Sequence, residues 1–263
     1  MYDEICYNKN FIEEVIVRID FSNSVNDFIS YMPKEIGKII KDRFPIAEPQ
    51  DVIGAELQIN GPQINGPQIN GQQINTQQMG FSNLGLPIIS KQWVFNSRDR
   101  KNQCIVTPNS VIFKYNAYNI YSDLKIVVND IITSINNAYP NIDAKRLGMR
   151  YVNNIRLNGD NGLIVDEYIT ALNNSRSSHL IRSVTVVEYS LEQDDINIRH
   201  QYGFMNKDYP AILNSDDFTI DIDAYVSGLL YLDEVDELMD KMHKEIQRVF
   251  ENSITDKLRD IMK

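Results

Sequence analysis

The sequence has little of what usually marks a metal-binding, redox or membrane protein. Among its 263 residues there are only two cysteines and three histidines. Cys6 and Cys104 form no motif, so we expect reduced thiols in a cytosolic chain. His179, His200 and His243 have no zinc-ligand spacing. No apolar run approaches the roughly 18 residues that a membrane helix needs, so we expect no membrane association.

The familiar signatures of catalysis are missing as well. The sequence contains no G-x-S-x-G nucleophile turn, no P-loop and no G-x-G-x-x-G phosphate loop. These absences count against the common hydrolase and nucleotide-binding families, and we expect no cofactor. The opening residues MYDEICYNKNFIEEV lack a basic stretch followed by an apolar core, so we expect no signal peptide and a cytoplasmic location.

Positive charge is scarce. The net charge is -10 and the isoelectric point is about 4.8, which disfavours nonspecific binding to a phosphate backbone. The densest cationic run, RDRKN at 98–102, has the pattern of a hairpin turn. We therefore expect no nonspecific nucleic-acid binding.

One segment is present in excess, a five-residue QINGP unit repeated over residues 58–77. Its Gly-Pro pairs, Gly61-Pro62 and Gly66-Pro67, interrupt both helix and strand. A period of five matches neither the helical nor the strand period, so its isoleucines cannot line one face. The pattern predicts an exposed low-complexity loop over 61–80 that the fold tolerates; a flexible docking tether is the alternative.

The remaining sequence predicts strands and amphipathic helices. Period-two alternation predicts strands at 13–21, 52–60, 91–97, 103–109, 110–116, 145–158, 179–192, 194–206 and 217–227. Apolar stripes at helical spacing predict long helices that end at Pro45 and Pro140, and a third at 232–254. A short helix is expected at 165–173, and another follows residue 254.

The order of these elements is similar in the two halves. Each half has a strand, a helix, further strands and a long helix, although no sequence similarity between the halves is visible. We therefore predict an α+β fold of two pseudo-repeated units, 1–140 and 145–263, closely packed. Short hairpin connections favour mostly antiparallel sheet, with the long helices on one face.

Three short stretches resemble a sporadically distributed prokaryotic family of uncharacterised proteins. They are RLGMRYVNNIRL at 146–157, the Phe44-Pro45 helix end, and MHKEIQRVFENSITDKL at 242–258, which carries a His-x6-Phe-x3-Ile-Thr pattern. The resemblance extends over nearly the whole chain apart from the repeat. It implies no established activity, and the family's patchy distribution suggests a mobile-element or defence context.

The mid-chain stretch also supplies candidate binding residues. Arg146 and Arg150 could each hold a carboxylate or phosphate in two-pronged fashion, beside Tyr151 and Asn153. The alternative is structural: these side chains satisfy loop carbonyls and ion pairs between the two halves.

Tyrosines form a second set of candidates. There are 14 in the chain, and FKYNAYNIY at 113–121 places Tyr118 and Tyr121 at the start of a helix, where a partner could dock. The alternative is a core completed with tyrosines.

The most specific hypothesis of an enzyme active site rests on Asp217, Asp221 and Asp223. Asp221 and Asp223 alternate with isoleucines, so both carboxylates leave one strand face and could bind Mg²⁺ for phosphate chemistry. The alternative is a solvated strand face in an acidic protein.

The leading hypothesis is a protein that binds another protein or forms a homo-oligomer. The alternatives are this metal-dependent enzyme and a small-molecule sensor with a ligand between the units.

Overall fold

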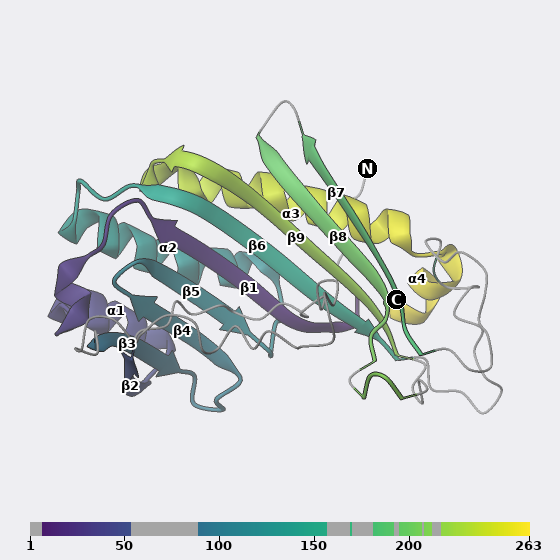
Figure 1. Ribbon diagram of the computed structural model, residues 1–263, viewed down its shortest axis with the longest axis horizontal. Helices are drawn as coiled ribbons and strands as arrows, with labels where there is room; N and C mark the ends of the chain where they lie inside the picture. The colour runs from purple at the N-terminus through teal and green to yellow at the C-terminus, as the bar shows by residue number, and fades with distance from the viewer. Residues whose placement is uncertain are drawn as a thin grey trace, which may run out of the picture.

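A single antiparallel sheet forms the centre of the computed structural model (Figure 1). The structure describes residues 7–53, 89–156, 169, 181–191, 195–206, 208–211 and 217–263. The strand order is β2-β3-β4-β5-β1-β6-β9-β8-β7, and the paired neighbours are antiparallel. The predicted mixed α+β class with antiparallel sheet is therefore confirmed.

The first half of the chain supplies five strands and two long helices. Their bounds are β1 Ile12–Phe21, α1 Lys34–Arg43, β2 Ile46–Ile53, β3 Ile89–Asn96, β4 Asn102–Thr107, β5 Ser110–Tyr115 and α2 Tyr121–Ala138, with a short 3-10 turn η1 at Asn26–Ile29. The second half supplies β6 Ala144–Ile155, β7 Ser183–Leu191, β8 Ile196–Phe204, β9 Phe218–Leu230, the turn η3 Leu232–Glu234, α3 Val235–Ser253 and α4 Asp256–Met262.

Strand alternation divides the central strands into two faces. In β1, Val15, Val17 and Ile19 are fully buried and belong to the main hydrophobic core. The same parity holds in β6 and β9, where the core face is formed by Leu147, Met149, Tyr151, Ile220, Ile222 and Ala224. The residues between them point to the other side, which we call the outer face.

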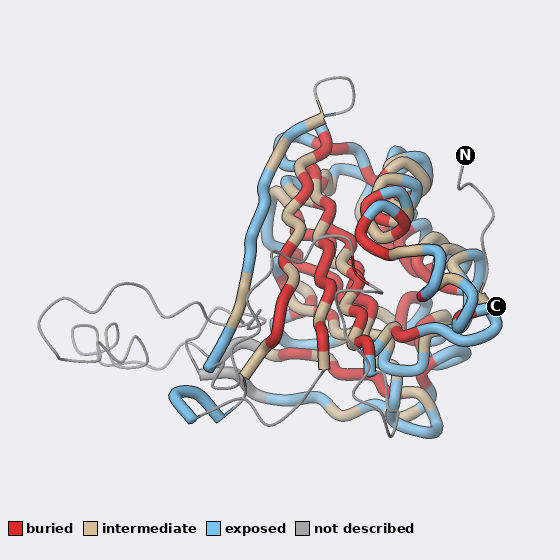
Figure 2. The backbone as a smooth tube through the Cα atoms, turned by 90° about the vertical axis from the view of Figure 1, so that its right-hand side faces the viewer, coloured by how far each residue is buried: buried red, intermediate tan, exposed pale blue. Residues whose placement is uncertain are grey.

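Amphipathic helices pack against the central strands and against one another. Helix α3 packs on β9 and β6 and contacts α2, which in turn packs against α1. The buried stripe of α3 contains Met239, Met242 and Ile246, spaced as the helical period requires. Figure 2 shows the buried residues gathered in the central strands and on the sides of the helices that approach them. No helix in the described ranges is long and apolar enough to cross a membrane.

One predicted element needs correction. The second strand starts at Ile46, directly after Pro45, and not at 52. The sequence pattern missed residues 46–51 because Pro49 usually argues against a strand. β2 is an edge strand, where the missing N–H of proline is tolerated. The helix expected at 165–173 lies outside the described residues apart from Ile169, which forms a β-bridge with Ile254. The QINGP loop at 61–80 also lies outside them.

Candidate functional site

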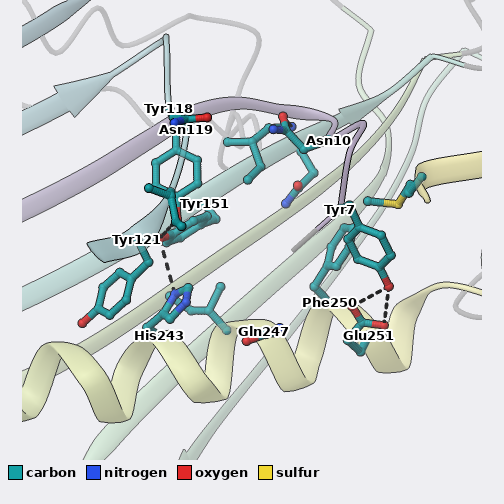
Figure 3. Close-up of a pocket in the computed structure, with 15 residues that line it drawn as sticks. Tyr7, Asn10, Tyr118, Asn119, Tyr121, Tyr151, His243, Gln247, Phe250 and Glu251 are labelled. Atoms are coloured by element: carbon teal, nitrogen blue, oxygen red, sulfur yellow. Dashed lines mark hydrogen bonds between the residues drawn. The ribbon is translucent and has the colours of Figure 1, made fainter. Parts of the chain in front are cut away.

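A pocket with a cavity of about 160 Å³ lies between elements from both ends of the chain. Its walls come from the segment before β1, the loop between β5 and α2, strand β6 and helix α3 (Figure 3). We call it the tyrosine pocket. Its aromatic lining is Tyr7, Tyr118, Tyr121, Tyr151, His243 and Phe250, and its polar lining is Asn10, Asn119, Asn153, Gln247 and Glu251.

Strand β6 provides the two most buried pocket residues of the mid-chain motif. Tyr151 and Asn153 lie two positions apart, so both point to the core face. Each is about 4% exposed. Asn153 donates a long hydrogen bond of 3.4 Å from Nδ2 to the carbonyl of Ile220 on the adjacent strand β9. The local alternation of β6 therefore directs these two side chains toward α3.

The loop that follows β5 brings two tyrosines over Tyr151. The rings of Tyr118 and Tyr151 meet nearly at right angles, with centroids 5.4 Å apart. The Tyr151 hydroxyl donates to the Tyr118 hydroxyl at 3.2 Å. Tyr121, the first residue of α2, donates from its hydroxyl to Asp240 on α3 at 2.9 Å. The loop is thereby tied to both β6 and α3.

His243 of α3 completes this side of the pocket. Its ring stacks on Tyr121 with centroids 3.9 Å apart and an interplanar angle of 12°. Its Nδ1 lies 3.4 Å from the Tyr151 hydroxyl. Burial lowers the pKa of His243 to about 4, which outweighs the raising effect of Asp240, so the imidazole is neutral at pH 7. Burial also raises the pKa of Tyr151 well above its ordinary value, so that phenol is neutral too.

The opposite side of the pocket is built around a buried carboxylate. Glu251 is 1% exposed and accepts hydrogen bonds from the Tyr7 hydroxyl at 2.9 and 3.0 Å. Arg259 of α4 donates to the same carboxylate from Nε at 2.8 Å. Burial is the main cause that raises the pKa of Tyr7, and its hydrogen bond to Glu251 adds to the effect, so Tyr7 remains a neutral donor. The negative charge of Glu251 is thus paired but still borders the pocket.

Helical spacing explains why α3 supplies several of these groups. His243, Gln247, Phe250 and Glu251 are separated by four, three and one residues, which places them on one side of the helix. Figure 3 shows them along the length of α3 that faces β6 and the segment before β1.

The predicted binding residues separate into two groups. Tyr118, Tyr121, Tyr151 and Asn153 meet in the tyrosine pocket. Arg146 and Arg150 have the opposite strand parity and lie on the outer face. The six residues therefore do not form one site, because neighbouring positions of a strand point to opposite faces.

On the outer face the two arginines make ion pairs within the sheet. Arg150 donates to both oxygens of Asp221, from Nε at 2.7 Å and from Nη2 at 2.6 Å. The guanidinium of Arg146 lies over the ring of Tyr225, with its Cζ 5.0 Å from the centroid.

Arginines also hold the carboxylates of the metal hypothesis. Asp221 pairs with Arg150, Asp223 lies 3.6 Å from Arg146, and Asp217 lies 3.2 Å from Arg156. The predicted shared face of Asp221 and Asp223 is present in β9. Among the described residues no group of three His, Cys, Asp or Glu side chains is arranged to hold a metal ion.

The lining also contains residues that were not among the predicted site residues, and three of them, His243, Glu251 and Tyr7, make the polar contacts described above. His243 was predicted only as part of the family pattern, and Glu251 lies inside that pattern eight positions later. Their common helical face was the signal that could have selected them. Tyr7 carries no such signal, because its contact with Glu251 spans 244 residues of sequence.

Comparisons with known proteins do not assign this chain to a family. No family model matches the chain, and neither the curated proteins nor the solved structures contain a significant match. The resemblance described above remains a prediction.

Proposed function

We propose that this chain is a binding protein that holds a small molecule in the tyrosine pocket. The observation that carries the proposal is the lining: aromatic rings and amide side chains surround a cavity of about 160 Å³, and its one carboxylate is already paired. Such a mixture of apolar walls and a few placed polar groups is typical of ligand sites.

The position of the pocket favours a sensor. Residues before 140 contribute Tyr7, Tyr118 and Tyr121, and residues after 145 contribute Tyr151 and His243. A ligand there would contact both halves and stabilise the arrangement that brings them together. We also propose that the halves are pseudo-repeats with their long helices on one sheet face, since the orders β1-β5-β4-β3 and β6-β9-β8-β7 correspond.

A pair of variants on α3 tests the pocket. Gln247 is half-buried in the lining, so Gln247→Trp should fill the cavity, whereas Lys244→Trp adds the same ring on an exposed position of the same helix. We expect native mass spectrometry of protein purified from its host, and thermal-shift screening of small molecules, to show binding in the wild type and in Lys244→Trp only. Binding that survives in Gln247→Trp would place the ligand elsewhere.

A protein partner remains a second candidate, favoured by the edge strand β7. β7 ends the sheet with Val186 and Val187 exposed, whereas the opposite edge strand β2 contains Pro49 and Glu48. Proline protects an edge, and β7 lacks it; although β7 carries Glu188, its exposed valines leave it able to add a strand from a partner or a second copy. Sedimentation of the wild type against Val187→Lys would show whether this edge mediates association.

A further inference from the structure

The aromatic rings of the tyrosine pocket are arranged as walls around a space. Tyr118 and Tyr151 form a corner, with an interplanar angle of 80°. Figure 3 shows Tyr118 and His243 on one side of the opening and Tyr7 and Phe250 on the other. Tyrosine and phenylalanine faces carry partial negative charge, so such an arrangement attracts a positive group.

The formal charges of the lining point the same way. Glu251 is the one acidic side chain among the described lining residues, and neither lysine nor arginine is among them. His243 is neutral at pH 7, since burial lowers its pKa to about 4. An anionic ligand would therefore find no lysine or arginine in the lining to pair with, which is unfavourable in a partly buried site.

We propose that the tyrosine pocket binds a small organic cation, an alkylated ammonium group of about the size of trimethylammonium. This inference rests on the proposed function and adds the chemical class of its ligand. The rings supply cation–π attraction, and Glu251 adds a negative charge that Arg259 partly offsets. The small cavity favours a compact head group.

The long-range field of the protein is consistent with such a ligand. The chain carries a net charge of -10, which raises the local concentration of cations near its surface. Arg259 partly offsets Glu251 at the pocket wall, since its Nε lies 2.8 Å from the carboxylate. The attraction for a cation therefore comes chiefly from the aromatic rings. An experiment on it has to compare a cation with an uncharged molecule of the same shape.

Isothermal titration with choline and with 3,3-dimethylbutan-1-ol makes that separation, because the alcohol has the same shape without the charge. We expect choline to bind the full-length protein at least about tenfold more tightly than the alcohol. Gln247→Trp should abolish both titrations, and Lys244→Trp should change neither.

A ring-removal variant tests the cation–π contact itself. Tyr118→Leu, on the loop before α2, should weaken choline binding and leave the weak affinity for the alcohol unchanged, whereas Tyr118→Phe should restore choline binding. Equal affinity of choline and the alcohol would overturn the cation inference while leaving a small-molecule pocket in place. Absence of choline binding, with a neutral or anionic molecule retained in native mass spectrometry, would also overturn it. Loss of all pocket binding would remove the proposed function itself.

Discussion

Arg150 and Asp221 show how much one pair of side chains matters on the outer face. Asp221 is 3% exposed, and its partner Arg150 is 16% exposed, so both charges are largely removed from water. The two-pronged geometry satisfies both carboxylate oxygens. The same motif position that suggested ligand binding thus has a structural role that the strand neighbours explain.

Replacing this arginine should be severely destabilising. We expect Arg150→Ala to lower the free energy of unfolding by about 3–5 kcal/mol, because Asp221 would remain buried without a partner. Arg156→Ala is the matched control: its pair with Asp217 joins two half-exposed side chains at 3.2 Å. We expect that control to cost less than about 1 kcal/mol. Urea denaturation measures both, and equal losses would contradict a special role for the buried pair.

Individual residues also mark the limit of reasoning from sequence. Alternation correctly predicted that Asp221 and Asp223 share a face, because side-chain direction in a strand is a local property. It did not reveal that arginines from β6 lie beside them. Which strand becomes the neighbour depends on pairing across about 70 residues, and a local pattern carries no information on that pairing.

At the scale of elements, the junction between β7 and β8 depends on one glycine. Gly203 has φ of +144°, and a Cβ there would lie 1.9 Å from the backbone oxygen of Ser183 on β7. Backbone cannot move aside as a flexible side chain can. The close approach of the two strands therefore requires glycine at this position.

An alanine substitution at Gly228 distinguishes the cost of backbone strain from the cost of a steric clash. Gly228 in β9 has φ of +132° but no atom within 4 Å of a built Cβ. We expect Gly228→Ala to cost about 1–2 kcal/mol from backbone strain alone. Gly203→Ala should cost more and should accelerate hydrogen exchange throughout β7 while the central strands β1 and β6 stay protected. Uniform exchange changes in both variants would argue against a local contact.

The helices were the elements best predicted from sequence. The stripes of α2 and α3 repeat at the helical period over 18 and 19 residues, so their apolar faces are unambiguous. Strand β2 was placed several residues too late, since its proline is compatible with a strand only at a sheet edge. Whether a strand is an edge is decided by the fold and cannot be seen in the strand itself.

At the scale of the whole molecule, buried titratable groups should make stability depend on pH. Burial lowers the pKa of His200 and of His243 from 6.5 to about 4. Below pH 6.5 the unfolded chain therefore binds protons that the folded protein excludes, and stability is lost as pH falls toward 4. Asp223 has the opposite effect, because burial raises its pKa from 3.8 to about 6. Its contribution to the free energy of unfolding is therefore lost as pH rises through 6.

A histidine variant should isolate one of these contributions. We expect His243→Gln to flatten the fall in unfolding free energy between pH 6.5 and 4 by on the order of 3 kcal/mol, since each pKa unit corresponds to about 1.4 kcal/mol. Urea titrations at several pH values measure the slope. Asp223→Asn is the contrasting control, which should steepen the fall across the same range. An unchanged slope in His243→Gln would mean that this imidazole is solvated in the folded protein.

The sequence by itself determined most elements, the two faces of each strand and the apolar faces of the helices. These follow from side-chain period, and period is fixed within about ten neighbouring residues. Only the tertiary structure decided that β1 and β6 join the two halves in one sheet, and that Tyr7 reaches Glu251, the partner of Arg259, near the other end of the chain. The tyrosine pocket depends on both of these long-range pairings. Its residue types were visible in the sequence, but its existence required contacts between residues that are far apart along the chain.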